Sequence, residues 1–73
     1  MPSELPQESR RQLLEEALNR LPPEFREVLF LFEIERWSYQ AIAAALDMPL
    51  GTVMSRLSRA RRRLQQELAQ VSK

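Results

Sequence analysis

Residues 38–64 read SYQAIAAALDMPLGTVMSRLSRARRRL, and their pattern is the clearest indication of the fold. Ser38 is a good helix N-cap, and the helix that it starts should end after Leu46, because Asp47 and the Met48-Pro49 step follow at once. Pro49 suits the first position of a new helix. The pattern therefore predicts a short helix over about residues 38–46, a turn of about three or four residues, and a long helix over about residues 49–70.

The long helix separates its side chains into two faces. At ~100° per residue, its apolar stripe contains Val53, Leu57, Ala60, Leu64 and Leu68. The other face gathers small polar side chains and guanidinium groups: Thr52, Ser55, Arg56, Arg59 and Arg63. Arg61 and Arg62 lie on the two flanks, so the positive charge forms a wide band. A short helix, a turn and a basic second helix are typical of a helix-turn-helix, whose second helix enters the DNA major groove.

Two more helices are expected before this pair. Ser9 and Gln12 form a capping-box pattern, and an apolar stripe follows, which predicts a helix over about residues 9–20. The LPPE sequence at residues 21–24 breaks the chain, and Pro23 suits the start of a helix over about residues 23–35. The fold class is thus all-α: a small four-helix domain over residues 9–73, with a long C-terminal recognition helix, after a flexible linker over residues 1–8.

The inward stripes of these helices predict the core. We expect the following side chains to be buried: Val28, Leu29, Phe32, Ile42, Leu46, Val53, Leu57 and Leu64.

Composition and charge reduce the number of function classes that fit this chain. The chain has 73 residues, enough for one domain, and it contains no Cys and no His, so we expect no enzyme, no cofactor and no metal site. No apolar run is long enough to span a bilayer, and a cytoplasmic location is expected. Residues 1–47 hold five Arg and nine Asp or Glu, a net −4, whereas residues 48–73 hold five Arg, one Lys and one Glu, a net +5. This asymmetry indicates nucleic-acid binding, although basic helices also bind acidic proteins and membrane surfaces.

The helix over residues 23–35 is apolar on more than one side, with the run FLFEI at residues 30–34. Either its neighbours enclose it, or part of it receives a partner. We expect a concave surface formed by the first two helices and the start of the last one, which accepts an amphipathic helix. Its lining should include some of Leu14, Leu18, Leu31, Phe32 and Ile34.

The residues LPPEFREVLFLFEIERWSYQAIAAALDMPLGTVMSRLSRARRRL, 21–64, resemble the fourth domain of bacterial RNA polymerase sigma factors, in particular the extracytoplasmic-function (ECF) group. The resemblance implies that the last helix binds the minus-35 element of promoter DNA. It also implies that the apolar groove holds the flap-tip helix of the polymerase β subunit, and that an anti-sigma factor competes for that groove. The second sigma domain is absent from this chain, so the chain should be an excised part of a longer protein and should not start transcription alone.

By this resemblance, Thr52, Ser55, Arg56 and Arg59 match DNA-facing positions, and Arg61 and Arg62 match flanking phosphate contacts. Two positions depart from a common pattern, which puts the preferred base sequence in doubt: Met54, where Lys or Arg is frequent, and Ser58, where an aromatic residue or His is frequent.

Two alternatives stay open. One is the DNA-binding domain of a LuxR-type response regulator, which shares the four-helix plan. The other is a protein-interaction module whose basic helix binds an acidic partner. Salt-dependent binding to random duplex DNA separates this second alternative from a DNA-binding domain.

Overall fold

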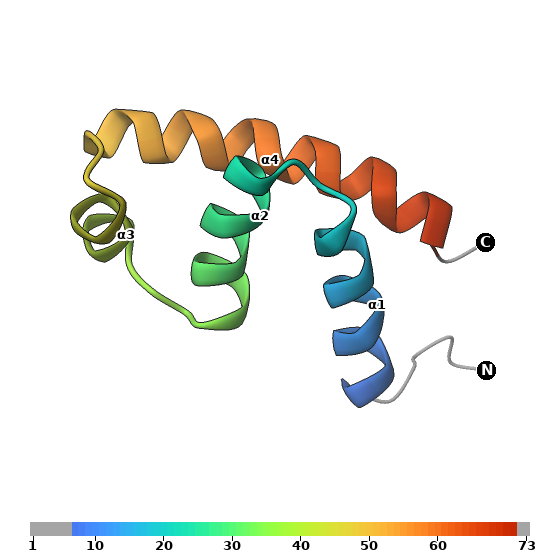
Figure 1. The fold of residues 1–73 in the computed structure, drawn as a ribbon. Coiled ribbons are helices and arrows are strands. Elements are labelled where there is room, and N and C mark those ends of the chain that lie inside the picture. Colours follow the sequence, from blue (N-terminus) through green and yellow to red (C-terminus); the bar gives the residue numbers. More distant parts are fainter. Residues whose placement is uncertain (1–6, 72–73) are drawn as a thin grey trace.

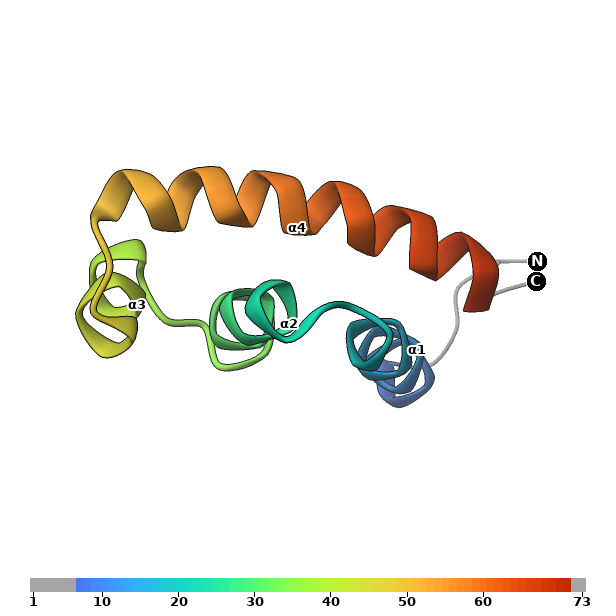
Figure 2. The ribbon, with the colours of Figure 1, turned by 45° about the horizontal axis from the view of Figure 1, so that its top comes forward.

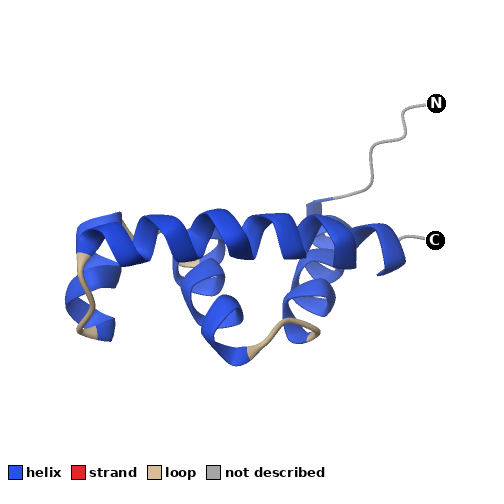
Figure 3. Ribbon diagram, turned by 90° about the horizontal axis from the view of Figure 1, so that it is seen from above, coloured by secondary structure: helices blue, strands red, loops and turns tan. Residues whose placement is uncertain are grey.

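The computed structural model describes residues 7–71, and the side chains of residues 9–71. Its elements are α1 (Gln7–Asn19), α2 (Pro23–Leu29), the π-helical turn η1 (Phe30–Ile34), α3 (Tyr39–Leu46) and α4 (Leu50–Val71). Helices account for all the regular structure of these residues (Figure 3), which confirms the all-α fold class. None of these helices is both long enough and apolar enough to cross a bilayer.

The long helix α4 is the base on which the other helices pack. It runs along one side of the domain, and α2 lies between α1 and α3 (Figure 1). A second view shows the three shorter helices side by side along α4, each seen nearly end-on (Figure 2). This arrangement gives an elongated domain, with extents of 43 × 19 × 16 Å.

The turn between α3 and α4 forms as the sequence predicts. The Ser38 side chain accepts a hydrogen bond from the backbone N–H of Ala41 at 3.0 Å, which caps α3. Asp47 ends α3 in the left-handed region, with φ 55°, and the Met48 N–H donates to the Ala43 carbonyl at 3.0 Å. Asp tolerates this conformation better than most residues, and this hydrogen bond is typical of a Schellman ending. After this turn, α4 begins at Leu50.

The helix boundaries differ slightly from those that the sequence predicts. α1 begins at Gln7, two residues before the predicted start, and residues 1–6 of the predicted linker lie outside the described residues. The larger difference is at residues 30–34, where the predicted single helix 23–35 widens into η1. The Glu35 N–H donates to the Phe30 carbonyl, five residues back. An apolar pattern does not distinguish this wider turn from an α-helical one.

The core lies where α1, α2 and α3 meet α4. Its buried side chains are all apolar: Ala17, Leu18, Leu21, Val28, Leu29, Ile42, Val53, Leu57, Ala60 and Leu64. Six of the eight predicted core residues are among them. Phe32 and Leu46 are only partly buried, which corrects the prediction for these two. Phe32 belongs to η1 and stacks on the Tyr39 ring at the edge of the core, with 5.2 Å between ring centroids, and Leu46 lies in the last turn of the short α3.

Candidate nucleic-acid interface

The arrangement of α4 divides its surface into a packed side and an open side. Val53, Leu57, Ala60 and Leu64 are buried against the other helices, as the helical wheel predicts. The side chains of Ser55, Arg59, Arg62 and Arg63 are exposed, whereas Thr52 and Arg56 are half-buried. The open side is therefore polar and cationic along the first four turns of the helix.

Four arginines of this open side carry charge that no carboxylate of residues 9–71 balances. Among the side chains of these residues, no carboxylate lies at ion-pair distance from Arg56, Arg59, Arg62 or Arg63. The acidic residue of α4, Glu67, lies 3.9 Å from Arg20 of α1, near the other end of the helix. Uncompensated guanidinium groups on one helix face attract a polyanion, because each forms charge-assisted bonds with phosphate oxygens.

Arg61 has different surroundings from the other arginines. Its guanidinium carbon lies 4.9 Å from the centroid of the Phe32 ring, and its Nε lies 3.6 Å from a carboxylate oxygen of Glu33. Through these two contacts, Arg61 packs α4 against η1. Its predicted contact with a DNA phosphate stays a prediction, and the side chain would have to make that contact from this flank of the helix.

The two small polar residues of the open side lie in its first turns. The Ser55 hydroxyl donates to the Thr52 carbonyl at 3.3 Å, a local bond that still leaves the hydroxyl oxygen free to accept. Thr52 and Ser55 lie on the same helix as the arginines, with Thr52 one turn before Arg56 and Ser55 one turn before Arg59.

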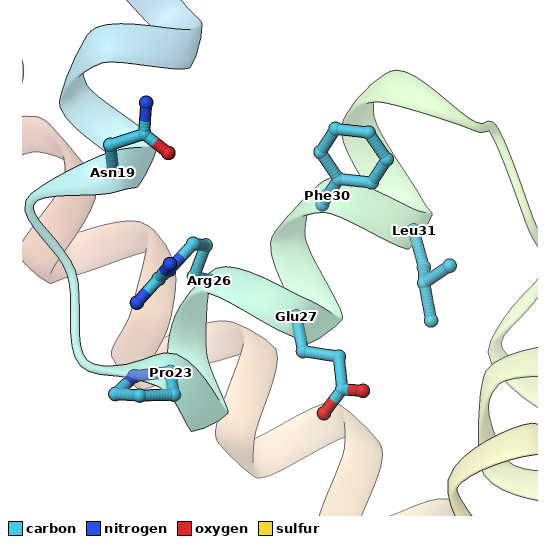
Figure 4. A pocket seen from close by; sticks show the side chains of 6 residues that line it. All are labelled: Asn19, Pro23, Arg26, Glu27, Phe30 and Leu31. Atoms are coloured by element: carbon cyan, nitrogen blue, oxygen red, sulfur yellow. The ribbon is translucent and has the colours of Figure 1, made fainter.

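A second candidate surface lies between α1 and α2 (Figure 4). A hollow of about 520 Å³ is lined by Asn19, Pro23, Arg26, Glu27, Phe30 and Leu31. A smaller hollow of about 180 Å³ adjoins it and shares Asn19, Arg26 and Phe30. The Phe30 side chain is 38% exposed. The Nε of Arg26 is buried, and no described residue accepts a hydrogen bond from it.

This hollow differs from the predicted groove in its lining. Of the five predicted residues, Leu31 lines the larger hollow, and Leu18 borders only the smaller one and is 2% exposed, so Leu18 is a core residue. Ile34 lines a separate hollow with Arg11, Glu33 and Arg36, while Leu14 and Phe32 are partly buried elsewhere. No residue of α4 lines the larger hollow. The sequence-based prediction did not include Phe30 and Arg26 among the lining residues. The apolar run at residues 30–34 could have indicated Phe30.

Comparison with known proteins identifies relatives. The family described as "Sigma-70, region 4" matches residues 11–64. The ECF RNA polymerase sigma factor SigE of Mycolicibacterium smegmatis is 49% identical over 59 residues, which cover 81% of this chain and 23% of that protein. The ECF RNA polymerase sigma-E factor of Escherichia coli (strain K12) is 43% identical over 54 residues, which cover 74% of this chain and 28% of that protein. The chain therefore spans about a quarter of the length of these relatives.

Proposed function

The chain belongs to the sigma-70 region 4 family, and from this membership we propose that it recognises promoter DNA for a bacterial RNA polymerase. The observation that carries the proposal is the open side of α4, where four arginines without a carboxylate partner among the described side chains lie on the second helix of a helix-turn-helix. The matching family and the named relatives are sigma factors, which argues against the response-regulator alternative.

We further propose that α4 lies in the major groove of the minus-35 element. Thr52, Ser55, Arg56 and Arg59 come first along the helix and would contact base edges or nearby phosphates. Arg62 and Arg63 follow, and Arg61 lies on the flank against Phe32, so these three would contact the phosphate backbone. Phosphate contacts of this kind fix the position of the helix, whereas base contacts select the sequence.

The hollow between α1 and α2 is the proposed docking site for the flap-tip helix of the polymerase β subunit. Phe30 and Leu31 offer apolar area to one face of such a helix. The Arg26 Nε, which has no acceptor among the described residues, would gain a carboxylate or carbonyl oxygen from the incoming helix. An anti-sigma factor that binds the same hollow would compete with the polymerase.

These roles describe part of a larger activity. Because the relatives are about four times as long as the match, we propose that initiation itself needs protein segments beyond residues 1–73. The isolated chain should bind DNA and the flap tip but should not direct transcription.

The first experiment measures binding of the chain to random duplex DNA by fluorescence anisotropy at several salt concentrations. We expect the logarithm of the association constant to fall linearly with the logarithm of salt concentration, with a slope of about −0.9 for each phosphate neutralised. Binding that is absent at low salt, or that does not depend on salt, would contradict the proposal and favour a protein-interaction module.

A further inference from the structure

Among the five arginines of α4, Arg61 alone has a carboxylate partner within residues 9–71. Its Nε lies 3.6 Å from a carboxylate oxygen of Glu33 in η1, and the other four arginines have no such neighbour. The Arg61 guanidinium group also lies over the Phe32 ring, 4.9 Å from its centroid. Both contacts hold the Arg61 side chain on the flank of α4 that faces η1.

The ion pair between Arg61 and Glu33 is loose. A separation of 3.6 Å between nitrogen and oxygen is longer than a hydrogen bond, so the two groups attract each other through charge alone. A DNA phosphate offers Arg61 shorter, charge-assisted hydrogen bonds. It would approach the N–H edge of the guanidinium group, while the Phe32 ring covers one of its faces. The same guanidinium edge can thus serve the carboxylate or a phosphate.

Glu33 has a second cationic neighbourhood besides Arg61. A hollow of about 260 Å³ is lined by Glu33 together with Ile34, Arg11 and Arg36. Arg36 forms no ion pair with a carboxylate of residues 9–71. Because attraction between charges persists over several ångströms, the Glu33 carboxylate stays favourably placed when Arg61 leaves it. The pair can therefore open without leaving Glu33 far from any cation.

We propose that Glu33 competes with a DNA phosphate for Arg61 and thereby lowers the affinity of the domain for DNA. In the free chain, the carboxylate offsets part of the Arg61 charge and holds the side chain toward η1. In the bound state, the phosphate takes the N–H edge of Arg61, and Glu33 turns to the hollow that Arg36 lines. The inference rests on the proposed DNA binding and adds a residue outside α4 that limits it.

The test compares Glu33→Gln with the native chain in anisotropy titrations with random duplex DNA at several salt concentrations. Glutamine keeps the size of the side chain and removes its charge, so Arg61 becomes available to a phosphate. We expect Glu33→Gln to bind about two- to fivefold more tightly at low salt, the size of effect that exposed ion pairs show. The salt slope should also become steeper by up to about 0.9, because one more phosphate is neutralised.

Glu35→Gln is the matched control. Glu35 is exposed directly after η1 and forms no ion pair with a cation of residues 9–71, so its replacement measures the change in net charge alone. Glu33→Gln should bind DNA more tightly than Glu35→Gln does. In an Arg61→Ala background this difference should disappear. Thermal melting of Glu33→Gln should match that of the native chain, because an exposed ion pair contributes little to stability.

Two results would overturn the competition and leave the proposed function standing. One is an equal gain of DNA affinity in Glu33→Gln and Glu35→Gln. The other is a gain in Glu33→Gln that persists in full when Arg61 is replaced by alanine. Absence of all DNA binding overturns both proposals.

Discussion

At the residue scale, Arg61 and Arg62 are adjacent in the chain but have different surroundings. Arg61 lies over the Phe32 ring and near Glu33, whereas Arg62 is exposed and has no carboxylate of residues 9–71 at ion-pair distance. The Arg61 and Glu33 side chains are 46% and 34% exposed, so solvent screens their ion pair and it contributes little to stability. The contact between Arg61 and the ring contributes more, because the guanidinium group lies over its negative face.

Replacing Arg61 should therefore lower the stability of the domain, whereas replacing Arg62 should lower its affinity for DNA. We expect Arg61→Ala to lower the free energy of unfolding by about 0.5–1 kcal/mol, and Arg62→Ala to leave it unchanged. Arg62→Ala should instead weaken DNA binding for all sequences and reduce the salt slope by about one. Thermal melting and anisotropy titrations of both variants check this. A loss of stability in Arg62→Ala, with none in Arg61→Ala, would show that the contacts of Arg61 are not those of the folded chain in solution.

Gly51 gives a second prediction at this scale. Alanine fits the position without a clash, and it restricts the unfolded chain more than glycine does. We expect Gly51→Ala to raise the free energy of unfolding by about 0.4–1 kcal/mol. The same methyl group should weaken DNA binding, because Gly51 is exposed in the first turn of α4, the part of the helix that we propose enters the groove. Increased stability with unchanged DNA affinity would mean that Gly51 is only a residue tolerated at the helix start.

At the scale of elements, the α3–α4 turn is the part that sequence reasoning predicted best. Ser38 and Asp47 act through local chemistry, as the cap and the end of α3, and Pro49 directly precedes α4, so the amino-acid types alone indicate the turn. The left-handed backbone of Asp47 was not part of the prediction. The inward stripe of α4 was equally predictable, because a 22-residue amphipathic helix has a strong periodicity.

The edge of the core and the lining of the hollow depend on how the helices pack against each other. The η1 turn changes where Phe30 and Phe32 point, and the apolar pattern does not contain that information. Phe32 was therefore predicted in the core and lies at its edge. Leu18 was predicted on a partner surface and lies in the core, because α1 packs this side chain against the other helices. The lining of the hollow was missed for the same reason, because Arg26 and Phe30 join it only through the packing of α2 beside α1.

The cap of α3 can be tested directly. Removing the Ser38 hydroxyl leaves the Ala41 N–H without its acceptor, so Ser38→Ala should lower the free energy of unfolding by about 0.5–2 kcal/mol. Ser58→Ala is the matched control, because Ser58 is exposed within α4, where alanine favours the helix. Urea unfolding followed by circular dichroism measures both. Equal stability of the two variants would contradict a structural role for the cap.

At the scale of the whole molecule, the two candidate surfaces are separate. The hollow between α1 and α2 contains no residue of α4, and the cationic side of α4 is exposed apart from it. A bound flap-tip helix and bound DNA should therefore not exclude each other.

This separation predicts a selective variant. Phe30→Asp places a charge where an apolar side chain lines the hollow, and it should abolish binding of a flap-tip peptide while leaving DNA affinity within the error of the native chain. Glu27→Gln is the control at the same hollow and should retain peptide binding. Isothermal titration calorimetry with the peptide, and anisotropy with duplex DNA, measure the two activities. Parallel loss of both activities in Phe30→Asp would point to unfolding or to a single shared surface.

In this domain, we propose α4 as the DNA-binding helix. The most direct test is titration of the ¹⁵N-labelled chain with duplex DNA, followed by the amide shifts of every residue in the NMR spectrum. We expect shifts concentrated in the first four turns of α4 and in the turn that precedes it, with the amides around Asn19 and Glu27 unmoved. Shifts centred on the hollow between α1 and α2, with residues 50–63 unchanged, would contradict it.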